Sequence, residues 1–411
     1  MQDRAFFWEL LLAMTASDSA ALRGARGHVV LIGGGHSHVG VLRELALRPL
    51  PHGRLTLICN GVDAPYSGML PGYVAGHYRF EDVHLDLPKL AAWAKADFIC
   101  DEVVGIDRVH RQVLCRHHPP VPYELCSINT GAAPQMGAVS GADAHAIAVK
   151  PIPQFQAHWL RLLARVRQDT APLPPLRIAV VGGGAGGVEL CLALQYRLLN
   201  ERKEWQRQGQ HTAQGSASVQ FQLFSRDAQL LRTHNPKVRD IFTRTLRQRG
   251  VQLHLNTEIV AVTHGQIQTA TGECHAADEV MWVTQAGGAA WLRDTGLDLD
   301  AQGFVCVNDC LQSSDPAIFA AGDVASLRSR RLEKAGVFAV RMGPPLAENL
   351  RRQLAGLPLK PYRPQRHWLS LISTGDRYAV ASRGAWGCEG AWVWRWKDHI
   401  DRRFMRRFSP P

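Results

Sequence analysis

Cysteine is scarce in this sequence and does not form a metal or redox motif. Nine cysteines are spread irregularly through 411 residues, which argues against the disulfide framework of a small secreted scaffold. No CxxC occurs, and the closest approach to one, Cys306 and Cys310, lies in a segment typical of a strand and a turn. We therefore expect free thiols in a reducing compartment, without structural zinc, a redox dithiol or another metal site.

Long hydrophobic runs are also missing. No stretch reaches the roughly 18 apolar residues that a membrane-spanning helix needs. The apolar segment from Ala5 to Met14 is interrupted by Glu9 and lacks a clean basic region before it, so it fits a signal peptide poorly. We interpret residues 1–27 as a loose or partly helical leader.

Acidic residues are outnumbered by basic ones. The 47 Lys and Arg against 36 Asp and Glu give a net charge of +11, which indicates an anionic partner: a phosphate-rich cofactor, a membrane surface or nucleic acid. No recognition motif accompanies the charge, so nucleic acid is not expected. With 46% apolar and 20% charged residues, a chain of this length is expected to fold into two to three globular domains.

Two segments show the order of strand, glycine turn and helix that opens a dinucleotide-binding βαβ unit. In the first, an apolar run from His28 precedes GGGHSH, and in the second, an apolar run from Leu176 precedes GGGAGG. A third glycine signal, IFAAGDVA at residues 318–325, ends a late strand. This returning strand implies that the second unit is inserted into the first, which gives an α/β fold of two Rossmann-like domains.

The second glycine turn matches the dinucleotide fingerprint GxGxxG in full, at Gly182, Gly184 and Gly187. The first glycine permits the tight turn, the second lets the backbone approach a pyrophosphate, and the third lets helix and strand pack closely. We expect a bound dinucleotide; a turn without a ligand is the alternative. Glu189 either caps the following helix or contacts nicotinamide. Arg226, after the next strand, either pairs with a 2′-phosphate, as in NADPH, or is a solvated loop residue.

The first glycine turn departs from the fingerprint. Gly33 and Gly35 match, but His38 replaces the third glycine, so either the helix lies further from the strand or the imidazole lies outside their contact. Without a third ligand, His36 and His38 are not expected to bind a metal, and donation to a phosphate is the favoured use. Asn60 replaces the acidic residue that usually holds the adenosine ribose, and it can make a neutral hydrogen bond there.

Six motifs together resemble one known family. They are GGGHSHVGVLREL (33–45), APYSGMLPG (64–72), TGAAP (130–134), GGGAGGVEL (182–190), AAGDVA (320–325) and KAGVFAVRMGPPLAENL (334–350). They resemble the FAD-containing pyridine nucleotide-disulfide oxidoreductase superfamily, and within it the NADH dehydrogenase-like flavoproteins often fused ahead of selenophosphate synthase. Type II NADH dehydrogenases and sulfide:quinone oxidoreductases are more distant relatives in this resemblance.

The resemblance implies FAD in the first unit and NAD(P)H in the second. The implied domains are the leader (1–27), an FAD-binding domain in two parts (28–150 and 291–365), the inserted NAD(P)H-binding domain (151–290) and a C-terminal segment for membrane association or dimerisation (366–411). The residues implied around FAD are Gly33, Gly35 and His36 at the pyrophosphate; Tyr66, Gly68, Met69 and Pro71 beside the flavin; Gly131 past the adenosine half; Gly322 and Asp323 at the ribitol; and Lys334 and Val337 near the isoalloxazine ring.

Two of the implied residues carry chemical roles. Lys334 would stabilise charge on the reduced flavin, and Glu189 is the other candidate for a catalytic role. Gly287 would lie near the nicotinamide half, while Asp323 either accepts a ribitol hydroxyl or caps a helix. Sulfide oxidation is not expected, because it needs two cysteines beside the flavin. No cysteine lies between Cys126 and Cys191 or between Cys310 and Cys388.

Aromatic residues recur near the C-terminus with helical spacing. The apolar residues at every fourth position are Trp392, Trp396, Ile400, Phe404 and Phe408, and Val393 lies on the same arc. Arg395, Arg402 and Arg406 face the other way. This pattern is typical of an amphipathic helix in the interface of an anionic membrane. The alternative is a helix that packs its apolar face on the protein or on a second subunit, as in a homodimer.

The sequence thus predicts an FAD-dependent oxidoreductase that takes hydride from NAD(P)H and passes electrons to an acceptor, a membrane quinone being favoured. We expect it in the cytoplasm, associated peripherally with the inner face of the cell membrane. Two alternatives stay open: an NAD(P)H-dependent reductase of a selenium or sulfur compound linked to selenophosphate synthesis, and a non-catalytic flavin-bound partner of that synthase. The choice between NADH and NADPH also stays open.

Overall fold

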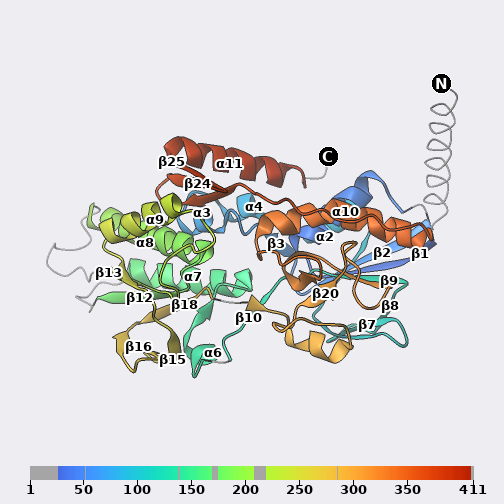
Figure 1. The fold of residues 1–411 in the computed structure, drawn as a ribbon, viewed down its shortest axis with the longest axis horizontal. Helices are drawn as coiled ribbons and strands as arrows, with labels where there is room; N and C mark the ends of the chain where they lie inside the picture. The colour runs from blue at the N-terminus through green and yellow to red at the C-terminus, as the bar shows by residue number, and fades with distance from the viewer. Residues whose placement is uncertain are drawn as a thin grey trace.

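The protein has two lobes, each built around a parallel sheet (Figure 1). The computed structural model describes residues 26–50, 52–137, 139–168, 175–207, 219–284 and 286–408. Nearly all of the expected leader therefore lies outside the described residues. Among the described helices, none combines the length and the apolar character that crossing a membrane would require.

The first sheet has the strand order β21-β9-β1-β2-β5, and every pairing is parallel. Its strands are β1 (Arg26–Ile32), β2 (His52–Cys59), β5 (Asp97–Cys100), β9 (Leu125–Ile128) and β21 (Ile318–Ala320). The centre of β1 is fully buried, as in parallel sheets covered on both faces. The chain leaves this sheet after β9 and returns at β21, which pairs with β9. The returning strand is therefore present.

The second sheet has the order β11-β18-β12-β13-β14 and is also parallel. Its strands are β11 (Ile147–Ala148), β12 (Leu176–Val181), β13 (Val219–Phe224), β14 (Gln252–His254) and β18 (Glu279–Trp282). All five lie in sequence between β9 and β21 of the first sheet. The prediction of two Rossmann-like domains, one inserted into the other, is confirmed.

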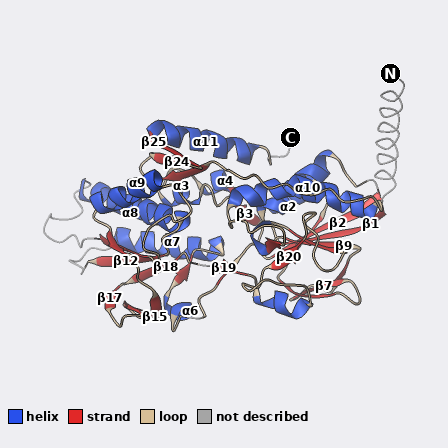
Figure 2. Cartoon of the chain, viewed as in Figure 1, coloured by secondary structure: helices blue, strands red, loops and turns tan. Residues whose placement is uncertain are grey.

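Helices flank both sheets, as Figure 2 shows. Those of the first lobe are α2 (His36–Leu47), α5 (Leu87–Trp93) and α10 (Gly336–Leu354), and those of the second are α7 (Ile152–Gln168), α8 (Ala185–Arg207) and α9 (Pro236–Gln248). Short elements lie between them: α3 (Leu70–Val74), α4 (Phe80–Val83), α6 (Ala142–His145), η1 (Ala290–Thr295) and η2 (Gly322–Val324). The helices α2 and α8 follow the two glycine turns directly, as predicted.

Smaller sheets complete the lobes. Three-stranded meanders are formed by β6 (Val103–Asp107), β7 (Gln112–Cys115) and β8 (Val121–Pro122), by β15 (Ile259–Thr263), β16 (Gln266–Thr269) and β17 (Cys274–Ala276), and by β23 (Ser370–Ser373), β24 (Ala379–Arg383) and β25 (Trp386–Gly390). Two-stranded pairs are β3 (Asp63–Pro65) with β4 (His84–Asp86), β10 (Ala133–Pro134) with β19 (Ala286–Gly287), and β20 (Val305–Val307) with β22 (Ala325–Leu327). The pair β10–β19 joins the outgoing and returning crossings between the lobes.

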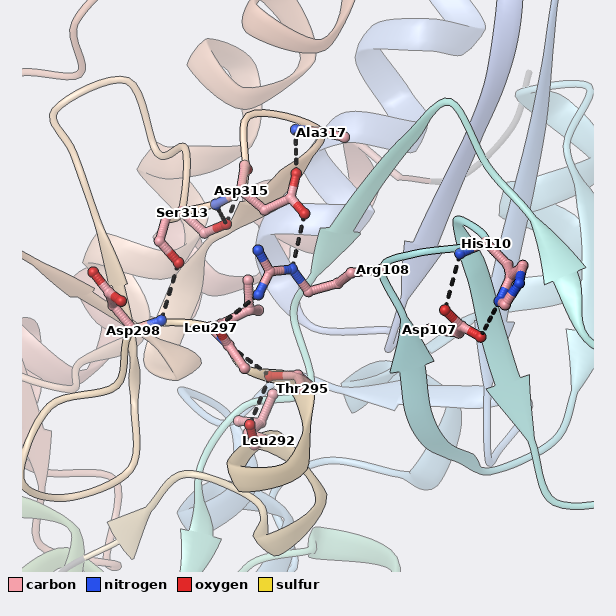
Figure 3. A network of polar contacts seen from close by, with 12 residues as sticks. Asp107, Arg108, His110, Leu292, Thr295, Leu297, Asp298, Ser313, Asp315 and Ala317 are labelled. Carbon is pink, nitrogen blue, oxygen red and sulfur yellow. Dashed lines mark hydrogen bonds and ion pairs between the residues drawn. The ribbon is translucent and has the colours of Figure 1, made fainter.

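A polar network fixes the segment that leads into the returning strand (Figure 3). Arg108, in the turn after β6, donates to the Asp315 carboxylate at 2.9 Å and to the carbonyl of Gly296 at 2.6 Å. The other carboxylate oxygen of Asp315 accepts from the backbone N–H of Ala317 at 2.9 Å. One arginine thus ties both ends of the 296–315 segment to the first part of the chain.

His38 fills the place of the third glycine, with its imidazole between the glycine turn and β9. Its Nδ1 lies 2.7 Å from the carbonyl oxygen of Gly33, and its Nε2 lies 2.9 Å from the hydroxyl of Ser127. Because a carbonyl only accepts, Nδ1 carries the hydrogen and Nε2 accepts from the serine. His38 is fully buried in this contact. The expectation that His38 donates to a phosphate is therefore wrong.

The C-terminal helix α11 (Ala391–Arg406) lies along one side of the molecule, next to β24 and β25 (Figure 1). The prediction of a single apolar face is wrong in part. Val393, Phe404 and Phe408 are buried, together with the charged Lys397 and Asp401. The remaining aromatic and aliphatic residues of the predicted arc stay in solvent: Trp392 is 54% exposed, and Trp396 and Ile400 are 37% exposed. The helix packs on the protein with one face and keeps an apolar strip on another.

The burial of His38 predicts a pH-dependent stability. Burial lowers the pKa of His38 to about 4 from an ordinary value of 6.5, so between these values the unfolded chain binds the proton more tightly. This contribution to stability is present above pH 6.5 and is lost as the pH falls towards 4. Between pH 7 and pH 5, the free energy of unfolding of the wild type should fall by about 2 kcal/mol more than that of His38→Gln. Urea unfolding at the two pH values measures this, with exposed His52→Gln as the control. Parallel pH dependences of wild type and His38→Gln would contradict it.

Candidate functional site: two dinucleotide sites

The first glycine turn presses against the end of β9. Gly33 has a φ of +90°, and a Cβ there would lie 2.7 Å from the carbonyl oxygen of Asn129. A Cβ on Gly35 would collide with the side-chain oxygen of the same asparagine. Only glycine therefore fits at either position. The helix N-terminus that follows supplies backbone N–H groups and a positive dipole end, which suit a pyrophosphate.

Asn129 connects three segments at this turn. Its side-chain oxygen accepts from the backbone N–H groups of Ser37 and His38, both at 3.1 Å. Its side-chain nitrogen donates to the carbonyl oxygen of Ala321 at 2.6 Å. Asn129 was not predicted from the sequence, although it directly precedes the TGAAP motif.

His36 is the first residue of α2, and its ring lies next to the loop of residues 66–69. This loop, predicted to lie beside the flavin, is called the flavin-side loop below. Its ring lies 5.4 Å from the ring of Tyr66, edge to face. Its Nε2 is buried and has no hydrogen-bond partner within the part of the chain that the structure describes. Burial lowers the pKa of His36 to about 4. The nearby charge of Asp323 raises this pKa and that of Lys150 lowers it. A neutral imidazole with an unpaired buried nitrogen fits a hydrogen-bonding group of a bound cofactor.

Asp323 follows the returning strand, in η2. Its carboxylate accepts from the Nζ of Lys150 at 2.8 Å. Lys150 lies at the crossing between the lobes, immediately before α7, and no sequence motif identified it. Gly322 beside it has a φ of +72°. The alternative that Asp323 caps a helix finds no hydrogen bond in its favour, since η2 has no side-chain cap.

Lys334 lies just before α10. Its Nζ donates to the carbonyl oxygen of Ala325 at 2.7 Å and lies 3.8 Å from the centre of the Phe304 ring. Burial lowers the pKa of Lys334 to about 8, although Asp323 acts in the opposite direction. Val337 is half-buried in the first turn of α10. Lys334 and Asp323 thus belong to one electrostatic cluster with Lys150 and His36.

The remaining residues predicted around FAD differ in their burial. Met69 and Pro71 are buried, whereas Tyr66 and Gly68 are half-buried. Gly131 has a φ of +77° and open space beside it. Asn60 is exposed at the end of β2, next to Cys59.

Two of the three fingerprint positions of the second glycine turn have no room for a side chain. A Cβ on Gly182 would lie 2.8 Å from the carbonyl oxygen of Val283, and a Cβ on Gly187 would collide with the carbonyl oxygen of Gly182. Gly184 differs, because a Cβ there would meet no atom within 4 Å. The open position is the one through which a pyrophosphate approaches the backbone.

Other predicted residues of the second lobe lie around this turn. Arg226 is exposed in the loop after β13. Gly287 is buried in β19 and pairs with Ala133 of β10, so it lies at the crossing between the lobes. Glu189 lies beyond the first turn of α8, so the alternative that it caps this helix is wrong. Its carboxylate accepts from the backbone N–H of Ser373 at 2.7 Å. This link to β23 was not predicted. Burial raises the pKa of Glu189 above its ordinary value, against the effect of Lys397.

A buried ionic group reaches the flavin-side loop from α11. The Nζ of Lys397 donates to the carboxylate of Asp401 at 2.7 Å and to the carbonyl oxygen of Gly68. The hydroxyl of Tyr66 donates to the other oxygen of Asp401 at 3.2 Å. Burial lowers the pKa of Lys397, but the carboxylates of Asp401 and Glu189 outweigh it and raise the pKa overall. Sequence reasoning missed this group, because Lys and Asp four residues apart are typical of an exposed helix face.

The arrangement of two glycine turns, one in each of two nested parallel-sheet lobes, defines a protein that binds two dinucleotides. The chain belongs to the pyridine nucleotide-disulphide oxidoreductase family, whose model matches residues 27–349. Its cofactors are FAD and NAD(P)H, as predicted.

Individual relatives show how widely this fold is used. The type II NADH:quinone oxidoreductase of Haemophilus influenzae is 26% identical over 193 residues, which cover 46% of this chain and 42% of the relative. The structure of NDH2 from Plasmodium falciparum has a TM-score of 0.75 at 13% identity, over 94% of this chain and 99% of the other. The sulfide:quinone oxidoreductase of Aquifex aeolicus has a TM-score of 0.74 at 18% identity, over 93% and 91%. Such low identities show the fold alone. The chain spans 38% and 43% of the length of two other curated relatives that it matches.

The residues present fit both cofactors. In the first lobe, the unpaired buried Nε2 of His36 and the glycines packed on Asn129 surround the N-terminus of α2. In the second lobe, the open side of Gly184 leaves room at the N-terminus of α8. Gly33, Gly35 and His36 would hold FAD, and Gly182, Gly184 and Gly187 would hold NAD(P)H.

Matched alanine variants should separate the roles of two glycines in the second turn. The methyl group of Gly184→Ala meets nothing in the protein, so the thermal unfolding midpoint should stay unchanged while NAD(P)H binding weakens about tenfold or more, about 1.4 kcal/mol. In Gly187→Ala the methyl group collides with the Gly182 carbonyl, so both binding and the midpoint should fall. Fluorescence titration, thermal unfolding and the visible absorbance of FAD measure these effects, and FAD content should stay at the wild-type level in both variants. Wild-type NAD(P)H affinity in Gly184→Ala would contradict the assignment.

Proposed function

We propose that this oxidoreductase passes electrons from NAD(P)H to a quinone held in a membrane, against which α11 lies. When bound, FAD accepts hydride from NAD(P)H and releases the electrons to the second substrate. The chain's contribution is to bind and orient the two dinucleotides in the two lobes. The name of the Haemophilus influenzae relative, a type II NADH:quinone oxidoreductase, supports this choice of acceptor.

The observation that carries the proposal is the double contact of α11. Its inner face donates through Lys397 to Gly68, and Asp401 accepts from Tyr66, in the loop predicted to line the flavin. Its outer face keeps Trp392 and Trp396 in solvent. If the two tryptophans insert into a membrane, a helix placed in this way brings the flavin-side loop next to that membrane. A lipophilic acceptor then has a short route to the flavin.

The outer face of α11 has the chemistry of an anionic lipid surface. The indole rings of Trp392 and Trp396 are stacked, with their centres 6.3 Å apart, and Ile400 continues the strip. Tryptophan is the residue type that favours the headgroup level of a bilayer. Basic side chains surround a hollow on the same helix, and they are His399, Arg403, Arg406 and Arg407. Such side chains attract lipid phosphates. The location at the inner face of the cell membrane remains a prediction.

Two ionisable groups suit electron transfer at the flavin. The ammonium of Lys334, whose pKa is lowered to about 8 by burial, is still mostly charged at pH 7 and would stabilise negative charge on the reduced cofactor. Glu189 has a raised pKa and lies in α8 two residues after Gly187, close enough to Lys397 for that charge to lower its pKa. Its role towards nicotinamide or the acceptor is part of the proposal. Arg226 is exposed in the loop after β13, where it can pair with the 2′-phosphate of NADPH. We therefore propose both NADH and NADPH as hydride donors.

Steady-state oxidation of NADH and NADPH tests the acceptor. Purified protein with bound FAD should reduce a short-chain quinone anaerobically, and the quinone should raise NAD(P)H consumption at least about tenfold over the slow reaction with oxygen alone. The Gly184→Ala variant, which should bind NAD(P)H weakly, provides the control for direct reduction of quinone by NAD(P)H. If NAD(P)H bleaches the flavin and no quinone increases turnover, the acceptor is not a quinone and the proposal fails.

Vesicle flotation tests the membrane surface. Each basic residue near anionic lipid should contribute about 1 kcal/mol, so changing Arg403, Arg406 and Arg407 together to Gln should weaken binding to anionic vesicles about a hundredfold and leave the weak binding to neutral vesicles unchanged. Changing Trp392, Trp396 and Ile400 to Gln should weaken both, because apolar burial does not depend on lipid charge. The exposed Arg247→Gln on α9 is the control. Unchanged binding in both combined variants would place the membrane contact elsewhere or remove it.

A further inference from the structure

The buried face of α11 carries more charge than packing requires. Its inward residues are Val393, Lys397, Asp401 and Phe404, one stripe along the helix. The side chains of Lys397 and Asp401 are only 9% and 7% exposed. A buried ion pair adds little net stability, because desolvation offsets the attraction, and apolar residues of similar volume often stabilise as well or better. Stability alone does not explain this pair.

Both charges are bonded to one loop of the first lobe. Lys397 donates to the backbone carbonyl of Gly68 as well as to Asp401. Asp401 accepts from the hydroxyl of Tyr66. The ring of Tyr66 is also stacked on Phe404, with the centres 4.5 Å apart. The loop is therefore held through a backbone atom, a hydroxyl and a ring, all by α11.

The loop in turn faces the first glycine turn. Tyr66 and Phe404 lie 5.4 Å and 6.2 Å from the ring of His36, measured between centres. The Nε2 of His36 is the buried nitrogen without a partner. The C-terminal helix α11 thus contacts Tyr66, and Tyr66 contacts His36 at the start of α2.

We infer that Lys397 and Asp401 are positioning residues for FAD: they fix Tyr66 and Gly68 and so make the C-terminal helix a part of the flavin site. The inference rests on the proposed placement of FAD beside Tyr66. It goes beyond the membrane role of α11, which depends on the opposite face of the helix. Removing the polar bonds frees the loop, and FAD then has to order it on binding, which lowers the affinity.

A paired variant separates positioning from packing. Single changes at Lys397 or Asp401 leave an unpaired buried charge and endanger folding. Lys397→Met/Asp401→Leu removes both charges while filling the space, so it should keep the thermal midpoint of the FAD-free protein within a few degrees of the wild type. Its dissociation constant for FAD, from titration of the FAD-free protein, should nevertheless rise about tenfold or more. The visible absorption maximum of the bound flavin should shift, because the loop beside it is no longer fixed.

Tyr66→Phe gives a second, milder measurement. It removes only the hydroxyl that Asp401 accepts from, and the ring can still stack on Phe404. Its FAD affinity should fall about three- to tenfold. Arg395→Gln, at an exposed position of the same helix, is the matched control and should bind FAD like the wild type.

The outcomes distinguish the inference from the function on which it rests. FAD affinity and spectrum equal to the wild type in the paired variant, at an unchanged midpoint, would overturn the inference, since the charges would then only pack the helix. Weakened FAD binding in the paired variant, together with an FAD-loaded wild type that fails to reduce quinone, would refute the acceptor and support the inference. A wild-type chain that binds no FAD would overturn both.

Discussion

The side-chain amide of Asn129 is the contact on which the first site depends. It accepts from two N–H groups at the start of α2 and donates to Ala321, at the end of the returning strand. The two segments that it joins are separated in sequence by the whole inserted lobe. A helix N-terminus attracts a phosphate only where it is held against its strand, and the single amide provides that constraint for both parts of the domain. Glycine is required at position 35, where a Cβ would collide with this amide, and at position 33, where it would press on the backbone carbonyl of the same asparagine.

His38 shows a second solution to the same problem. The third glycine of a dinucleotide turn usually allows helix and strand to approach, as Gly187 does in the second lobe. In the first lobe an imidazole bridges the Gly33 carbonyl and the Ser127 hydroxyl. The two lobes therefore share a topology but not the interaction that closes their turns. A buried, neutral histidine makes the first turn sensitive to acid, and the second turn has no titratable group in that place.

The C-terminal helix is where members of one fold can differ in what they do. The two lobes bind the flavin and the nicotinamide nucleotide. The segment that covers the flavin site decides from which side a second substrate can approach. Here α11 contacts the loop of Tyr66 and Gly68, with a charged inner face and an aromatic outer face. All nine cysteines are free, and Cys191 is fully buried within α8, where burial raises its pKa.

The sequence by itself determined the two lobes and their nesting. Glycine spacing and apolar strands report local conformation. The nested lobes could therefore be predicted from the glycine turn at Gly182, Gly184 and Gly187 and from the late strand at residues 318–320. It also indicated an amphipathic C-terminal helix. Only the tertiary structure decided which polar residues meet: Asn129 with Ala321, Lys150 with Asp323, and Lys397 with Gly68. These contacts join segments far apart in the chain, and a lysine or an asparagine has no local pattern that distinguishes a buried partner from a solvated one. The tertiary structure likewise decided that Trp392 faces solvent while Asp401 is buried, because helical periodicity gives the angle between faces and not what each face meets.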